Sequence, residues 1–269
     1  MTEQGGAGAM VERPVVGGMP AIKTIGIADV RDALGSGIDD FAAMAKMSVV
    51  FGLVYALAGL FILWIAIAQG LLVLAFPLVA GFTLIGPFAA VGLYEMSRHR
   101  EKGLPVTWST LLRSMRHASA GSIVFLGFAL MFTFFVWLRI ALLIYALIFG
   151  TAPIDIADLL DQLVTTGRGW LFLLLGNGIG AAFALMAFSL SVISFPLLLD
   201  RDADFVTAIV TSIRVVLINP VPMLLWAVIV AASLVVACAP AFLGLIIALP
   251  VLGHSTWHLY RKTVAGADS

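Results

Sequence analysis

The first uninterrupted apolar stretch of the sequence is MSVVFGLVYALAGLFILWIAIA, residues 47–68. As an α-helix it would be about 33 Å long at 1.5 Å per residue. That length crosses the ~30 Å hydrocarbon core of a bilayer. Five further apolar stretches follow along the chain. The six predicted spans are Met47–Ala68, Gly70–Tyr94, Ser119–Gly150, Gly169–Leu199, Val221–Cys238 and Ala241–Tyr260.

Composition supports the same interpretation. The chain has 269 residues, of which 62% are hydrophobic and only 11% charged, and its mean hydropathy is +1.11. A soluble domain of this size cannot hide so much apolar surface, whereas lipid can solvate it. We therefore predict an all-α, polytopic membrane helical bundle with six transmembrane helices. The formal net charge of zero gives no sign of nucleic-acid binding, and the single Cys238 excludes an internal disulfide.

The basic residues predict the orientation of these spans. Thirteen of the 15 lysines and arginines fall before span one, between spans two and three, between spans four and five, or after span six. Only Arg139 and Arg168 fall on the other side. By the positive-inside rule, both termini are then cytoplasmic in a multi-pass protein of the bacterial inner membrane. We expect a flexible cytoplasmic tail at 1–24, without a cleaved signal peptide, a membrane domain at 25–264 and a short tail at 265–269.

An amphipathic cytoplasmic helix is predicted before spans one, three and five. The first has an apolar stripe with Ile27, Val30, Leu34, Ile38 and Phe41, and its aspartates, Asp40 included, fall away from that stripe. The second follows Pro105, and the third follows a predicted Asp204 cap. Such helices either lie at the lipid headgroups or form a docking platform for a partner.

The return spans share a further feature, a proline before the cytoplasmic end. These prolines are Pro87, Pro196 and Pro250. Proline removes a backbone hydrogen bond and bends a helix. The sequence therefore suggests a threefold repeat, in which an amphipathic helix is followed by a helical hairpin with a bent return helix.

His254 and His258 are the weak candidates for metal or haem ligands. They are four residues apart, and two imidazoles at that spacing can share a metal. A third ligand is needed, however, and no cysteine cluster supplies one. The same histidines, with Trp257 and Tyr260, equally suit an interfacial belt of amphipathic rings.

Two polar residues are expected near the outer end of the long hairpin. Arg139 is the only formal charge within a long apolar run, so it is a functional candidate by default, although it could also snorkel to water. Asn177 lies at a comparable depth on the returning span. We expect a hydrogen bond between them as a possible intramembrane polar pair. Glu95 and Arg98 are expected to form a local ion pair.

The segment 176–180, GNGIG, superficially resembles a dinucleotide-binding loop. It lies inside a predicted span rather than between a strand and a helix, so that interpretation fails. Gly176, Gly180 and Ala184 instead form a ridge of small residues, which is typical of close helix packing in membranes.

The stretch 85–98, IGPFAAVGLYEMSR, resembles the hallmark of an uncharacterised bacterial integral-membrane family known only as domain of unknown function 2189. The stretches 195–201, FPLLLDR, and 252–258, LGHSTWH, fit the same family, as does the segment 33–41. The resemblance would cover about residues 25–264. It implies a six-span inner-membrane protein, and it carries no activity and no site residues.

Three classes of function stay open. The first is a non-catalytic accessory, assembly or scaffold component of a larger membrane complex, in contact with lipid and other membrane subunits. The second is a transporter or channel for a small or amphiphilic molecule, since broken helices often line midplane sites. The third is a haem- or metal-binding membrane protein using His254 and His258. No motif in the sequence predicts an enzyme, so we expect no catalytic residues and no cofactor.

Overall fold

The computed structural model describes residues 19–70, 78–79, 81–82, 86–114, 120–151 and 156–265. Within these ranges the chain is helical, and its one β-type pairing joins Ile22 to Val264. Four helical segments are long and apolar enough to cross a membrane. They are Ala45–Ala68, Gly121–Phe149, Gly167–Asp200 and Pro220–Cys238. The prediction of an all-α membrane protein is therefore confirmed.

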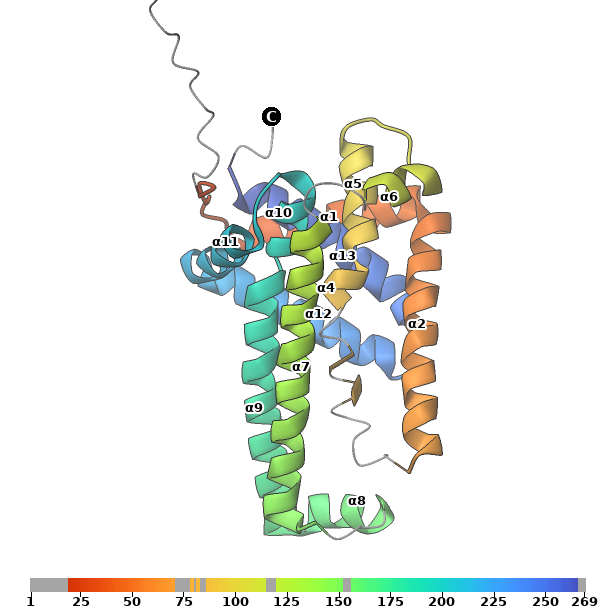
Figure 1. Cartoon of the computed structure of the whole chain (residues 1–269), viewed down its shortest axis with the longest axis vertical. Helices are drawn as coiled ribbons and strands as arrows, with labels where there is room; N and C mark the ends of the chain where they lie inside the picture. Colours follow the sequence, from red (N-terminus) through yellow and green to blue (C-terminus); the bar gives the residue numbers. More distant parts are fainter. Residues whose placement is uncertain are drawn as a thin grey trace, which may run out of the picture.

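A long hairpin forms one side of the molecule. Helix α7 (Ala120–Phe149) runs antiparallel to α9 (Gly167–Ser191), and the short α8 (Ile156–Thr165) lies across their far end (Figure 1). With 30 residues, α7 is about 45 Å long, which exceeds the hydrocarbon thickness. The hairpin therefore tilts in the bilayer or projects beyond it, as its length predicted.

The return helix of this hairpin is interrupted before Pro196. Helix α9 ends at Ser191, and α10 (Ser194–Asp200) begins after a two-residue turn. Proline has no N–H to bond the carbonyl four residues earlier, so the helix opens at this point. Ser212 in α11 (Phe205–Ile218) closes the gap, because its hydroxyl accepts a hydrogen bond from the Ile193 N–H at 3.2 Å.

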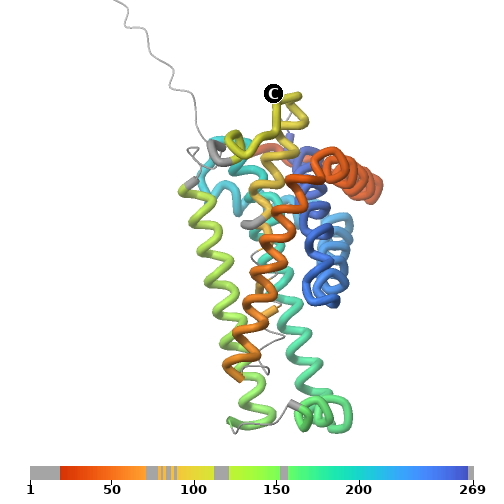
Figure 2. Tube along the Cα trace, turned by 90° about the vertical axis from the view of Figure 1, so that its right-hand side faces the viewer, coloured from red at the N-terminus to blue at the C-terminus, as the bar shows by residue number. Residues whose placement is uncertain are grey.

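A second, shorter hairpin consists of α12 (Pro220–Cys238) and α13 (Leu245–Thr263). Helix α13 packs against both α2 (Ala45–Ala68) and α1 (Ile27–Ala43), which brings the two ends of the sequence together (Figure 2). The approach to α2 is close at Gly52, where an added Cβ would lie 2.7 Å from the Cα of Ile246. A glycine at this position allows the two backbones to touch.

Helices α5 (Val91–Glu101) and α6 (Trp108–Ser114) lie toward the end of the bundle opposite α8 (Figure 1). The short α4 (Gly86–Ala89) precedes α5 and lies deeper in the bundle. The chain termini meet at the end opposite α8, because the Lys23 N–H donates to the Thr263 carbonyl and the Ala265 N–H to that of Ala21. Residues 19–24 of the predicted flexible tail are thus attached to the helical body, while 1–18 lie outside the described residues.

The apolar stripe predicted for α1 is only partly buried, since Val30 is buried and Leu34 is half-buried whereas other members face outward. The residues that α1 buries are Val30, Ala33, Gly37 and Asp40, whereas Ile27 and Ile38 are 58% and 50% exposed. The small Ala33 and Gly37 let α13 approach the backbone of α1, while Ile27 and Ile38 lie on the outer face. The buried face therefore contains an aspartate that the sequence pattern had placed in solvent.

Candidate functional site

A buried polar cluster lies where α1, α2, α5 and α13 meet. We call it the Asp40 cluster, and it consists of Asp40, Ser48, Ser97, Arg100, His254 and His258. Helical spacing builds two of its sides. Ser97 and Arg100 are one turn apart on α5, and His254 and His258 are one turn apart on α13.

Asp40 is the acceptor at the centre of this cluster. One carboxylate oxygen, Oδ2, accepts from Ser97 Oγ at 2.5 Å and contacts His258 Nε2 at 2.8 Å. The other, Oδ1, accepts from the Arg100 guanidinium. Burial raises the pKa of Asp40, but the hydrogen bonds from His258, Ser97 and Arg100 outweigh that effect and hold the pKa below its usual value. Asp40 is therefore a carboxylate at neutral pH.

His254 connects this carboxylate to α2. Its Nδ1 lies 2.7 Å from Ser97 Oγ, and its Nε2 lies 3.0 Å from Ser48 Oγ. Because Ser97 gives its one hydroxyl proton to Asp40, His254 must donate from Nδ1 to Ser97. Its Nε2 is then free to accept from Ser48. One neutral tautomer of His254 satisfies all of these contacts.

A Ser–His–Asp combination invites comparison with nucleophilic catalysis, but the geometry opposes it. In a catalytic triad the histidine lies between the serine and the carboxylate. Here Ser97 lies between His254 and Asp40, and Ser48, Ser97 and His254 are at most 1% exposed. The two hydroxyls are therefore shielded from solvent, and the cluster joins four helices.

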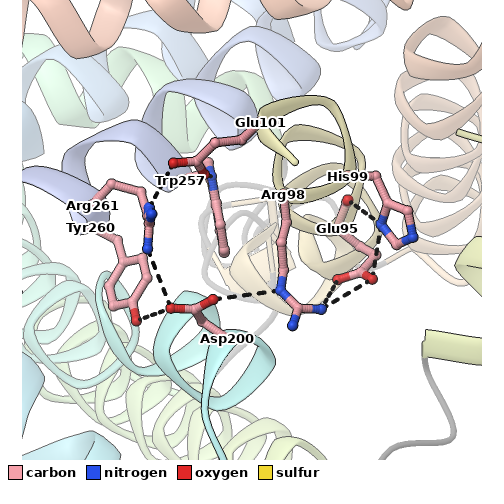
Figure 3. A network of polar contacts seen from close by, with 8 residues as sticks. All are labelled: Glu95, Arg98, His99, Glu101, Asp200, Trp257, Tyr260 and Arg261. Atoms are coloured by element: carbon pink, nitrogen blue, oxygen red, sulfur yellow. Dashed lines mark hydrogen bonds and ion pairs between the residues drawn. The ribbon is translucent and has the colours of Figure 1, made fainter. Parts of the chain in front are cut away.

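A second polar network lies beside the first and connects α5, α10 and α13 (Figure 3). Asp200 accepts from the Tyr260 hydroxyl at 2.8 Å, and its carboxylate lies 3.5 Å from Arg98 Nε and 3.7 Å from Arg261 Nη1. We call this the Asp200 network. Its members are Glu95, Arg98, His99, Glu101, Asp200, Trp257, Tyr260 and Arg261.

The two ends of the Asp200 network are also paired. Glu95 is almost fully buried, and it holds Arg98 at 3.3 Å and His99 at 3.0 Å. The local Glu95–Arg98 pair that the sequence predicted is thus confirmed. At the other end, Glu101 accepts from Trp257 Nε1 at 3.0 Å and from Arg261 Nε at 2.9 Å. These charges hold the ends of three helices in register.

The predicted metal pair, His254 and His258, is drawn into the Asp40 cluster. His254 contacts Ser48 and Ser97, and His258 contacts Asp40. Within the described ranges no group of three or more histidine, cysteine, aspartate or glutamate side chains is arranged to hold a metal ion. Both ring nitrogens of His254 and Nε2 of His258 already take part in hydrogen bonds.

The predicted Arg139–Asn177 pair is not formed. Both side chains are exposed on the surface of the long hairpin, and Asn177 donates its amide to the Leu173 carbonyl of its own helix at 2.8 Å. No hydrogen bond joins these two residues in the part of the chain that the structure describes. An amide can satisfy itself by bonding one turn back, so it does not need a partner on α7.

The ridge of small residues on α9 makes one of its three expected contacts. A Cβ at Gly180 would lie 3.0 Å from the Trp137 ring of α7, so this glycine does pack closely. Gly176 has open space beside it, and Ala184 is exposed along the wall of a cavity. The hairpin helices are in close contact near Trp137, and the Phe172 ring of α9 also contacts Tyr145 and Phe149 of α7.

The three prolines occupy different structural positions. Pro196 follows the interruption between α9 and α10, and Pro250 lies inside the continuous helix α13. Pro87 lies in the short helix α4, which a single turn residue, Ala90, separates from α5. It also lines an apolar cavity of about 450 Å³ between α4–α5, α9, α12 and α13.

Sequence reasoning missed Asp40, Ser97 and Asp200 as members of these networks. Each pairs with a residue far away in the chain, the most distant pair being Asp40 and His258, 218 positions apart. A usable signal was present, however. Asp40 aligns with Ala33 and Gly37 at helical spacing, and a column of small residues marks a face that another helix can approach.

Comparison with known proteins gives one match. Residues 75–200 match the model of a family described as "Predicted integral membrane protein (DUF2189)". This agrees with the family that the sequence resembles, although the match covers the middle of the chain rather than residues 25–264. No curated protein and no solved structure matches the chain.

Proposed function

From the match of residues 75–200 to a family of predicted integral membrane proteins, we propose that this chain is a non-catalytic accessory, assembly or scaffold component of a larger complex in a bacterial inner membrane. The observation that carries the proposal is the exposure of large apolar side chains on the outer face of α1. Ile27 and Ile38 are 58% and 50% exposed there, at the same end of the molecule as the polar networks. An apolar stripe beside charged residues suits contact with another protein subunit.

The proposed topology has six spans with both termini in the cytoplasm. Four spans correspond to helices of sufficient length and apolarity. We assign α13 as the sixth span and residues 70–94 as the second, although much of that segment lies outside the described residues. The positive-inside distribution of lysine and arginine supports this orientation, because 13 of 15 fall in the four stretches of sequence that this topology assigns to the cytoplasm.

We also propose that the chain consists of three related units. Each of α1, α6 and α11 is a helix that directly precedes an apolar span, namely α2, α7 and α12. The N-terminus of α11 supports the predicted unit boundary, since the Asp204 carboxylate accepts from the Thr207 N–H at 2.9 Å as predicted.

The alternative for α1 is that its outer face lies only on lipid headgroups. Replacement of Ile38 by the photo-crosslinking residue benzoylphenylalanine distinguishes the two in native membranes. We expect Ile38 adducts with a specific protein, identified by mass spectrometry, whereas the same residue at Phe61, an exposed position within α2, should give lipid adducts. Adducts with lipid alone at position 38 would contradict the scaffold role.

A second candidate is a carrier of a small amphiphilic molecule, which the apolar cavity beside Pro87 favours. Purified chain in vesicles should then accelerate transbilayer movement of a fluorescent fatty-acid ester. A rate equal to that in protein-free vesicles would exclude this candidate.

A further inference from the structure

The apolar cavity lies within the bundle on the side of the polar networks. At about 450 Å³ it falls in the range of about 300–1,000 Å³ that is typical of small-molecule sites. None of the described residues that line it is charged. Apolar walls without a charge favour a neutral molecule, because an ionised group would lose its hydration without a compensating partner.

The rim of the cavity reaches the surface that faces lipid. Among its lining residues, Leu224 and Val228 of α12 are each 56% exposed, and Leu185 of α9 is 45% exposed. These side chains come from two of the helices that are apolar enough to span a membrane. An occupant can therefore enter sideways from the bilayer.

One hydrogen-bond donor in the lining has no acceptor among the described residues: Trp226 is fully buried and its indole N–H is unpaired. Tyr94, which carries a hydroxyl, is a second buried residue of the lining. The other hydroxyls of the lining are already satisfied, since Ser191 donates to the Ala187 carbonyl and Thr256 to the Leu252 carbonyl. Away from water, an unpaired N–H is energetically costly, so an acceptor supplied by an occupant would be favoured.

We propose that this cavity binds one neutral acyl-chain lipid, with the hydrocarbon chain along the apolar walls and a carbonyl oxygen as acceptor for Trp226 and Tyr94. The inference does not depend on the accessory role, because it uses only the lining of the cavity. It specifies an uncharged ester rather than a free fatty acid or a plain hydrocarbon.

Native mass spectrometry of the full chain in mild detergent tests this directly, with methyl oleate, oleate and 1-octadecene as probes. We expect methyl oleate to form a saturable one-to-one adduct, about tenfold tighter than either of the others. W226F and Y94F should each weaken methyl oleate binding by about three- to tenfold and leave 1-octadecene binding unchanged. Since either variant could perturb folding, the unchanged hydrocarbon binding serves as the internal control.

Variants that fill the cavity provide a second test of the proposal. A184F introduces a ring at an exposed lining position of α9, and A182F introduces the same ring at an exposed position of that helix outside the lining. The methyl oleate adduct should be lost in A184F and kept in A182F. Equal adducts in both variants, equal affinity for methyl oleate and 1-octadecene, or preference for oleate would each overturn the proposal.

Discussion

The Asp40 cluster and the outer part of the α7–α9 hairpin are held together in opposite ways. In the cluster, buried polar groups from four helices pair at defined distances, such as 2.8 Å between Asp40 and His258. In the hairpin the contacts are apolar, such as that between the rings of Trp137 and Phe183 at 5.8 Å between centroids, and Phe132 and Leu147 are 71% and 76% exposed. Lipid can replace protein as a neighbour for an apolar side chain, but it cannot pair a carboxylate. Substitutions should therefore have much larger effects in the cluster.

The largest effect is expected from D40N. It removes the charge on which Arg100 and His258 converge, so the free energy of unfolding should fall by about 3 kcal/mol. The neighbouring, exposed D39N should change it by less than about 0.5 kcal/mol. Reversible unfolding in mixed micelles of mild detergent and SDS measures both. Equal stability of the two variants would show that the Asp40 pairings contribute nothing.

Acid should reproduce the effect of D40N. The folded-state pKa of Asp40 is lowered, so its stabilisation is fully present above its unfolded value of about 3.9 and is lost as the pH falls through the lower folded value. The stability difference between wild type and D40N should thus be constant from neutral pH to about pH 5 and shrink below pH 4. A difference that grows on acidification would contradict this sign.

The next effect concerns the close approach of α1 to α13. In G37A the new Cβ would lie 2.5 Å from the Ser255 backbone nitrogen, so the helices must separate, at a cost of about 2–3 kcal/mol. The matched G35A has open space beside it and should stabilise the exposed face of α1 by up to about 1 kcal/mol. The same unfolding assay separates the two, and a stabilising G37A would mean that α1 does not pack against α13 here.

A smaller effect is expected at the edge of the Asp200 network. W257F removes the hydrogen bond from Trp257 to Glu101, but Glu101 keeps its pairing with Arg261. We therefore expect the free energy of unfolding to fall by about 1.5 kcal/mol. W170F on the exposed surface of α9 serves as the control and should be near neutral. If the two substitutions cost the same, the indole N–H of Trp257 has no energetic role.

The smallest effect is expected in the hairpin. G180A must displace the Trp137 ring by a few tenths of an ångström, which offsets the gain in helix propensity, so the net change should be within about 0.5 kcal/mol. G176A meets no neighbour and should stabilise the chain by up to about 1 kcal/mol. Destabilisation of several kcal/mol by either variant would mean that the hairpin is as tightly specified as the Asp40 cluster.

The contrast also explains what the sequence could predict. Apolar length and local spacing predicted α2, the long hairpin, α12, the Asp204 cap and the Glu95–Arg98 pair, because each depends on residues close together in the chain. Asp40 could not be placed in this way, since a carboxylate on a helix normally faces water and its partners come from α5 and α13. The Arg139–Asn177 prediction was wrong because depth alone does not determine which faces of two helices meet.

The pairing of Asp40 with His258 has a consequence for biosynthesis. The residues between them take the ribosome about 10–40 s to add at 5–20 residues per second. Throughout that interval the nascent chain carries an aspartate without its imidazole neighbour, and α1 lacks the helix against which it packs most extensively. Completion of α13 thus closes the packing around α1, and chains stalled before it would expose the buried face of α1 to proteases and chaperones.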